Sequence, residues 1–375
     1  MKRRSLDGLD ILAIGGVAGY FLKRFSVRQG ALHNCISRHL PATMGVTIRD
    51  VAEQAKVSIS TVSRVLNDTC KVKEDKRLRV LNAAADLGYT PNPAAQSLHS
   101  RKTGAIGILL PYVSGDFYAE LLNGIDSAAQ EAGHMLLIST SHNSEEELTA
   151  ALRGMYRRVD GILVMAPVLT SNKVLESAPS GLPLVFLNTR TEGSSIPLIS
   201  FDNYGGMRQM TEYLIEQGHT RIGYITGSDE AFDAMERFRG YREALQLAGI
   251  PILEDLIVNG EYTQQAGFDG ARRLLALQRP PTAIMASNDD AAIGALSAIQ
   301  ESGLRVPEDV ALTGFDDIPS SAYTFPPLTT VHIPIAELGR RSVRLLAAAI
   351  QGGNGASDRL LSEKLPVELR IRASA

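Results

Sequence analysis

Two short helical patterns on either side of a two-residue break, Lys56-Val57, most constrain what the N-terminal part of this chain can fold into. Thr47 and Asp50 have the spacing of a capping box, and apolar residues then recur with the period of a helix. After the break, Ser58 can cap a second helix with one apolar stripe. The two stripes consist of Ile48, Val51, Ala52 and Ala55, and of Val62, Val65 and Leu66. Each helix has one face to bury, which predicts a helix-turn-helix unit.

The second predicted helix leaves a mostly polar outer face. That face carries Ile59, Ser60, Ser63 and Arg64. Short side chains let a helix approach the base edges in a DNA major groove, and arginine can reach phosphate or guanine. The pattern therefore favours a DNA-binding unit, although the same two helices could form an ordinary corner of a globular domain.

A third helical pattern covers residues 74–87. Leu78, Leu81 and Ala85 are expected to point inward, and Gly88 is expected to end the helix. The next segment, residues 89–98, reads Tyr-Thr-Pro-Asn-Pro-Ala-Ala-Gln-Ser-Leu. Asn92 can cap a hinge helix of about six to eight residues, with Pro93 at the first helical position, and such a helix is too short to persist alone.

Over these segments the chain resembles the LacI/GalR family of bacterial transcription regulators, and the resemblance continues to the last residues. It rests on the motifs Thr47-Ile48-Arg49-Asp50-Val51-Ala52, Val57-Ser58, Thr61-Val62-Ser63-Arg64-Val65, Leu87-Gly88-Tyr89 and the Pro-Asn, Ala and Leu positions of the hinge. It implies contacts with double-stranded operator DNA from Thr47, Ser58, Ile59, Ser60, Thr61, Ser63, Arg64, Asn67, Lys71, Ala95 and Leu98.

In the family, the hinge leucine, here Leu98, enters the minor groove and kinks the duplex. Two positions depart from the family pattern. Gln96 stands where many relatives carry Arg, so one contact with the backbone or the minor groove is in doubt. Lys73 replaces the usual small capping residue before the third helix.

The net charge of −3 hides an asymmetry along the chain. Residues 1–43 carry seven Lys and Arg against two acids, and residues 44–103 carry ten against six. The remainder carries 21 bases against 33 acids. A basic N-terminal module on an acidic body suits a protein whose small part binds nucleic acid and whose large part does not.

Residues 1–43 are interpreted as an extension without an assigned role, either poorly ordered or upstream of a true start at Met44. The apolar stretch 11–22 is too short for a bilayer span, so no membrane partner is expected. Cys35 and Cys70 suggest no disulfide framework and fit a reducing compartment, the bacterial cytoplasm, with the protein at the nucleoid.

From Gly104 onward, apolar runs alternate with amphipathic segments, which predicts doubly wound parallel sheets in two similar α/β lobes. The expected strands are 105–110, 135–139, 161–166, 183–188, 221–226, 282–286 and 310–314. The expected helices include 117–132, 145–158, 204–216, 232–248, 264–277 and 291–301.

The resemblance implies an N-terminal all-α helix-turn-helix DNA-binding domain (44–90), a hinge (91–103) and a two-lobed α/β domain (104–375) with parallel sheets. The last has the type I periplasmic-binding-protein-like fold, in which the chain crosses between the lobes three times. We expect these crossings near Phe201-Asp202, Phe315-Asp317 and Ile333-Pro334.

Ligands of open α/β sheets bind at the carboxyl ends of the strands, where several polar and aromatic residues fall. Together with the resemblance, this predicts a small-molecule effector, expected to be a sugar, bound by Phe117, Asn188, Arg237, Tyr262 and Asp289. Asp202 is a weaker candidate. Each has a structural alternative: Asn288 or Asp289 could cap a helix, the aromatic residues could belong to the core, and Arg237 could form a surface pair with Glu236 or Asp233.

No nucleophile elbow, phosphate loop or metal-ligand spacing occurs, so neither an enzyme nor a bound metal or cofactor is expected. The favoured function is a DNA-binding repressor controlled by a small-molecule effector. The alternative is a small-molecule binding protein without a DNA role. The end of the chain, residues 363–370, is strand-like without a leucine heptad, which favours a homodimer on a pseudo-palindromic operator over a tetramer.

Overall fold

The computed structural model describes residues 46–66, 72–90, 102–191, 196–352 and 362–375. The expectations for residues 1–43, and for Asn67, Lys71, Ala95 and Leu98, lie outside the described residues. The chain divides into two compact units, Met1–Pro91 and Asn92–Ala375, each of which is described by itself.

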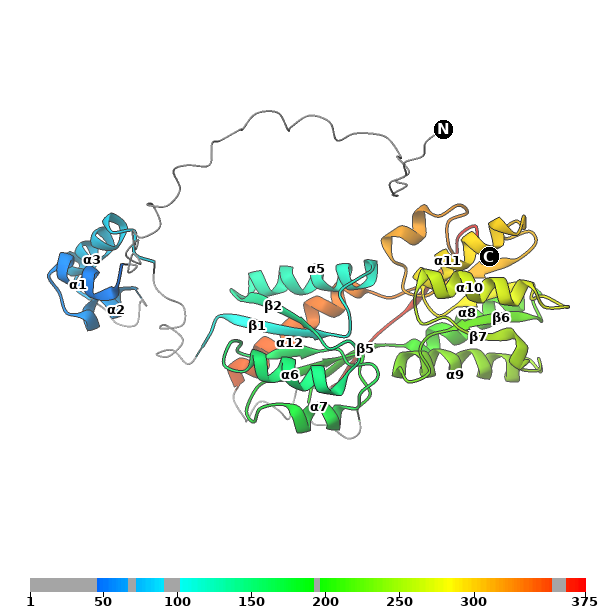
Figure 1. Ribbon diagram of the computed structural model, residues 1–375, viewed down its shortest axis with the longest axis horizontal. Helices are drawn as coiled ribbons and strands as arrows, with labels where there is room; N and C mark the ends of the chain where they lie inside the picture. The colour runs from blue at the N-terminus through cyan, green and yellow to red at the C-terminus, as the bar shows by residue number, and fades with distance from the viewer. Residues whose placement is uncertain (1–45, 67–71, 91–101, 192–195, 353–361) are drawn as a thin grey trace, which may run out of the picture. The chain divides into compact units, whose positions relative to one another are not determined.

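The described part of the first unit contains three helices, α1 (Ile48–Ala55), α2 (Ile59–Leu66) and α3 (Glu74–Asp86) (Figure 1). The predicted capping box is confirmed, because the Thr47 N–H donates to the Asp50 carboxylate at 2.7 Å. Lys56 ends α1 in the left-handed region with φ 52°, which turns the chain into α2. The Thr61 N–H then donates to Ser58 Oγ at 3.3 Å, as expected of a capping serine. The turn between α1 and α2 is therefore defined by Lys56 at the end of α1 and by the Ser58 cap at the start of α2.

The core of the first unit confirms the predicted faces of α1 and α2 but not that of α3. Leu78 and Leu81 are 52% and 42% exposed, and Ala85 is exposed as well. The buried residues of α3 are Val80, Ala83 and Ala84, which pack on the apolar stripes of α1 and α2. The prediction placed the larger leucines inward, whereas small residues on α3 allow close packing of the three short helices.

The first lobe of the second unit is built on a six-stranded parallel sheet in the order β11-β5-β4-β3-β1-β2. Its strands are β1 (Ala105–Leu110), β2 (Met135–Thr140), β3 (Ile162–Val164), β4 (Leu184–Leu187), β5 (Leu198–Phe201) and β11 (Glu363–Leu365). Alternate residues of β1 pack on opposite faces of this sheet. One face is covered by α5 (Asp116–Glu131) and α12 (Ile335–Gly352), the other by α6 (Glu145–Met155) and α7 (Ser171–Ser177).

The second lobe has a four-stranded parallel sheet in the order β7-β6-β8-β9. The strands are β6 (Ile222–Thr226), β7 (Ile257–Asn259), β8 (Ala283–Ala286) and β9 (Ala311–Thr313). One face packs against α8 (Asn203–Glu216) and α9 (Phe232–Leu247), the other against α10 (Gln264–Leu275) and α11 (Asp289–Glu301). Two short 3-10 helices, η1 (Glu254–Leu256) and η2 (Pro319–Tyr323), complete the lobe. This confirms the predicted fold class of two parallel α/β lobes.

The chain crosses between the lobes at two of the three predicted places. It leaves the first sheet after Phe201 to enter α8, and it returns after Ile333 to enter α12, which packs on α5. The predicted crossing at 315–317 is wrong, because the Asp316 N–H donates to Val331 O at 2.9 Å within the second lobe.

The third crossing lies instead at Pro366-Val367, near the end of the chain. β11 pairs with β5 of the first sheet, whereas β12 (Glu368–Arg370) pairs with β10 (Thr330–His332) beside the second. The strand-like C-terminal segment is therefore divided between the lobes. Among the described helices α12 is the longest, with 18 residues, and none has the sustained apolar character of a bilayer span.

Candidate functional site

The outer face of α2 presents short polar side chains to solvent. Ile59, Ser60 and Arg64 are exposed, and Thr61 and Ser63 are half-buried. Ser58 Oγ lies 2.9 Å from both Ser60 Oγ and Thr61 Oγ1, so the first turn of the helix carries a connected set of hydroxyl groups. Thr47, at the start of α1, is exposed too. These residues can reach a major groove without any change in the buried side of the helices.

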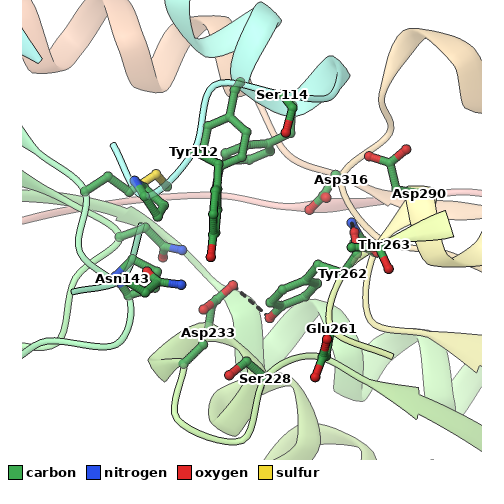
Figure 2. Close-up of a pocket in the computed structure, with 18 of the residues that line it drawn as sticks. Tyr112, Ser114, Asn143, Ser228, Asp233, Glu261, Tyr262, Thr263, Asp290 and Asp316 are labelled. Atoms are coloured by element: carbon green, nitrogen blue, oxygen red, sulfur yellow. Dashed lines mark hydrogen bonds between the residues drawn. The ribbon is translucent and has the colours of Figure 1, made fainter. Parts of the chain in front are cut away.

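A cavity of about 640 Å³ lies between the two lobes of the second unit, and both lobes line it (Figure 2). Its polar lining includes residues that follow the carboxyl ends of strands, among them Tyr112 after β1, Asn188 after β4 and Ser228 after β6. This is the position expected for a ligand site in open α/β sheets. Four of the five predicted effector residues line the cavity, namely Phe117, Asn188, Arg237 and Tyr262.

Asp289, the fifth predicted effector residue, does not line the cavity in this structure, and its contact with the effector stays a prediction. Its fully buried carboxylate accepts hydrogen bonds from the Ile318 N–H at 2.9 Å and the Thr330 hydroxyl at 2.6 Å. Burial raises the pKa of Asp289 well above its usual range, and the nearby Asp316 raises it further. These hydrogen bonds connect the start of α11 to the segment after β9, which contains Ile318, and to β10, which contains Thr330.

The residues on either side of Asp289 do face the cavity. Asn288 caps α11, accepting from the Ala291 N–H at 3.0 Å, and Asp290 contributes a carboxylate to the lining. Successive side chains at a helix start point in different directions. The strand end predicted for the site therefore lies at the cavity, with Asn288 and Asp290 in its lining and Asp289 buried beside them.

Arg237 is buried, with 2% of its surface exposed, which excludes the alternative of a surface pair. Its Nε donates to Asn203 Oδ1 at 2.9 Å, one Nη donates to Asp316 Oδ1 at 3.2 Å, and the other donates to the Ser287 carbonyl. The guanidinium also lies 3.8 Å from the centre of the Phe315 ring. Asn203 in turn donates to Asn188 Oδ1 at 3.0 Å, so one network connects the two lobes at the crossing after β5.

Asp316 is the buried counter-charge of Arg237. Burial raises the pKa of its carboxyl group to about 7, even though Arg237 acts in the opposite direction. Desolvation of a carboxylate disfavours its charged form, and one guanidinium compensates only in part.

Tyr262 and Asp233 form a second polar pair at the edge of the cavity. The Tyr262 hydroxyl donates to Asp233 Oδ2 at 2.8 Å (Figure 2). Gly227 makes room for the ring, because a Cβ there would collide with the aromatic atoms of Tyr262. Asp233 Oδ1 is buried and has no hydrogen-bond partner among the described residues. A buried carboxylate oxygen without a partner is costly, so this atom is suited to accept a hydrogen bond from a ligand.

Several polar and aromatic lining residues escaped the sequence reasoning. They are Tyr112, Ser114, Tyr118, Asn143, Ser228, Asp233, Glu261, Thr263, Asp290 and Asp316. Asp233 and Arg237 stand four residues apart on α9, a spacing that places both on one helix face and could have identified the pair. Asp202, the weaker candidate, instead caps α8 and forms an ion pair with Lys364.

Comparison with known proteins assigns both units to described families. The family of bacterial regulatory proteins, lacI family, matches residues 47–92, and the periplasmic binding protein-like domain matches residues 211–375. The chain is 35% identical over 329 residues to the transcriptional repressor CytR of Escherichia coli K12, covering 87% of this chain and 96% of that protein. It is also 35% identical over 305 residues to catabolite control protein A of Priestia megaterium, covering 81% and 92%.

Solved structures agree with these relatives. The lac repressor dimer bound to operator and the anti-inducer ONPF is similar at a TM-score of 0.78 and 31% identity, over 88% of this chain and 98% of that one. A complex of the transcriptional regulator CelR with cellobiose is similar at a TM-score of 0.64 and 32% identity, over 88% and 100%. The similarity therefore spans both units of the chain.

Proposed function

Because the chain belongs to the LacI family of bacterial regulatory proteins, we propose that it is a transcriptional repressor whose affinity for operator DNA depends on a small molecule in the interlobe cavity. The single observation that carries this proposal is the combination, in one chain, of an exposed polar face on α2 and a cavity lined by both lobes. The first suits DNA recognition, and the second suits a ligand whose binding changes the angle between the lobes.

DNA recognition is assigned to the first unit and to the hinge that follows it. Of the residues proposed above, Ile59 and Ser60 stand at the start of α2, the part of a recognition helix that meets base edges. Arg64, one turn further on, is placed to contact phosphate. Lys71 and Leu98 keep the roles that the family resemblance implies.

The protein is proposed to act as a homodimer on a two-fold symmetric operator. Large apolar side chains are exposed on both lobes, Met135 and Ile138 on the edge strand β2 and Tyr323 and Phe325 near η2. Where exposed apolar side chains form a contiguous patch, they mark an association surface. A symmetric dimer would place two α2 helices on two half-sites.

The effector is assigned to the cavity, where Phe117, Asn188, Arg237 and Tyr262 are proposed to contribute. A sugar is the expectation from the resemblance, and the hydroxyl and carboxylate groups of the lining suit a molecule rich in hydrogen-bond donors. Closure of the lobes around it would move the segments at the three crossings, which gives the effector a route to the DNA-binding unit. The protein is proposed to work in the cytoplasm, by binding and not by catalysis.

The proposal is tested by retardation of DNA from upstream of the gene, with and without small molecules that raise the melting temperature of the protein. We expect the protein to retard this DNA specifically, and we expect such a molecule to change the amount of DNA that is retarded. A protein that binds the molecule but no DNA would instead be a binding protein without a DNA role.

A further inference from the structure

The charges that line the interlobe cavity are unbalanced. Its described lining contains four carboxylates, on Asp233, Glu261, Asp290 and Asp316, and one cationic side chain, that of Arg237. Arg237 forms a salt bridge with Asp316, 3.2 Å away, and both groups are buried. Among the described residues no cation forms a salt bridge with Asp233, Glu261 or Asp290. Three carboxylates therefore line the cavity without a salt bridge to any described cation, and Arg237 is the single cationic side chain in the described lining.

Among the carboxylates of the lining, Asp233 is the one whose environment most favours a hydrogen bond or ion pair with a ligand. One of its oxygens accepts from the Tyr262 hydroxyl, and the other is buried with no partner in the described part of the chain. A cation or hydrogen-bond donor at this oxygen would remove the unfavourable burial of a free acceptor. Anionic ligands would meet repulsion from the same carboxylates.

Aromatic rings from both lobes surround this carboxylate. Tyr262 of the second lobe adjoins it directly, and Tyr112 of the first lobe points toward it across the cavity (Figure 2). Phe117 and Tyr118 line the same space and pack edge to face, with ring centres 5.2 Å apart. The faces of such rings attract cations, and most strongly where water is excluded.

We propose that the effector carries a protonated amine, as in an amino sugar or a short polyamine, and that the nitrogen is bound by Asp233 between Tyr112 and Tyr262. This inference rests on the proposed function and names the chemical class of its effector. It assigns to Asp233 the selection of positively charged effectors over neutral or negatively charged ones. It excludes phosphorylated and carboxylated small molecules from this cavity.

The experiment uses the full chain and probes that differ mainly in charge: glucosamine, glucose and glucose 6-phosphate, with spermidine as a second cation. Binding is measured by calorimetry and by the shift in melting temperature, because a ligand of the native state stabilises it by mass action. We expect at least one of the two amines to bind at least tenfold more tightly than glucose, and glucose 6-phosphate not to bind.

Asp233→Asn should weaken amine binding at least tenfold, whereas Asp269→Asn, which removes an exposed carboxylate on α10, should leave it unchanged. The ligand-free Asp233→Asn variant should also melt at a higher temperature than the unmodified chain, because an unpaired charge is removed while Asn still accepts from Tyr262. A merely structural Asp233 would give a lower melting temperature.

Absence of amine binding, tighter binding of glucose or glucose 6-phosphate, or full amine binding by Asp233→Asn would each overturn the inference. Retardation of upstream DNA by the unmodified chain is measured on the same preparation. Retained DNA binding with no amine binding would refute the ligand class alone. Loss of DNA binding would refute the proposed function instead.

Discussion

Arg237 on α9 and Asp316 after β9 form a salt bridge of 3.2 Å, with side chains 3% and 6% exposed, at the wall of the interlobe cavity. Such a pair is sensitive to the loss of either member, because the partner left behind is a buried charge. Arg237 also donates to Asn203, the first residue of α8 after the chain crosses between the lobes. The pair therefore links the cavity to a segment that must adjust when the lobes move.

Replacement of Arg237 by Ala should destabilise the protein by about 3–5 kcal/mol, because Asp316 would remain buried without its counter-charge. The matched control is Arg239→Ala, which removes an exposed ion pair with Glu236 on the same helix and should cost at most about 1 kcal/mol. Urea-unfolding curves of the two variants provide the measurement. Similar unfolding midpoints for both would show that the buried network contributes little.

The raised pKa of Asp316 predicts a specific dependence of stability on pH. The folded state holds this proton up to a pH of about 7, whereas the unfolded chain releases it near the ordinary value of 3.8. Between these values the folded state binds more protons, so the contribution of Asp316 to stability falls as pH rises through this window. Relative to Asp316→Asn, the unmodified protein should lose on the order of 2–4 kcal/mol between pH 4 and pH 7. A stability difference that stays constant over this range would contradict the prediction.

The sequence predicted the location of the cavity better than its chemistry. Ligand sites in open α/β sheets follow strand ends, and strand ends such as that of β8 are visible as the end of an apolar run. The direction of a single side chain after that end is not visible, because one residue more or less along a helix turns the side chain by about 100°. The family resemblance points to Asp289, whereas in this structure Asp290 lines the cavity and Asp289 is buried.

The differences between the predicted and observed buried face of α3, and between the predicted and observed third crossing, also have local causes. α3 has two overlapping apolar faces, one with Leu78 and Leu81 and one with Val80, Ala83 and Ala84. Packing against α1 and α2 decides that the second face is buried. The three-residue strands β10 and β12 depend on pairing with each other, across 35 or more residues of chain, and have little pattern of their own. That pairing also sets the third crossing, which sequence periodicity could not locate.

Asp289→Ala should reduce the stability of the protein. Removal of its carboxylate would leave the Ile318 N–H and the Thr330 hydroxyl without acceptors in a buried site, at a cost of about 1–3 kcal/mol for each. Asp290→Ala, one residue further along, should change stability much less, because Asp290 lines the cavity and, among the described residues, accepts only from the Gln264 side chain. Thermal melting of the two variants distinguishes the roles, and a larger loss for Asp290→Ala would reverse them.

The exposed face of α2 should determine operator choice and affinity through different residues. Substitution of Ile59 and Ser60 together by Ala should change the preferred half-site, with each altered base pair worth about 1–3 kcal/mol. Arg64→Ala should instead weaken binding to all sequences alike and reduce the salt dependence of log K by about one. Binding to a randomised operator library at two salt concentrations measures both effects. An unchanged half-site preference in the double variant would exclude these positions from base recognition.

The contact between α10 and α11 should tolerate no side chain at Gly294. A Cβ at this position would collide with the backbone carbonyl of Gln264, and backbone cannot move aside as a flexible side chain can. Gly294→Ala should therefore force the two helices apart and destabilise the second lobe by about 2 kcal/mol or more, in the range of overpacked cores. Gly154→Ala on α6 is the matched control, because open space surrounds its Cβ position and alanine favours the helix by about 1 kcal/mol. Opposite shifts in melting temperature are expected from these chemically identical substitutions, and equal shifts would show that the close helix contact does not limit the fold.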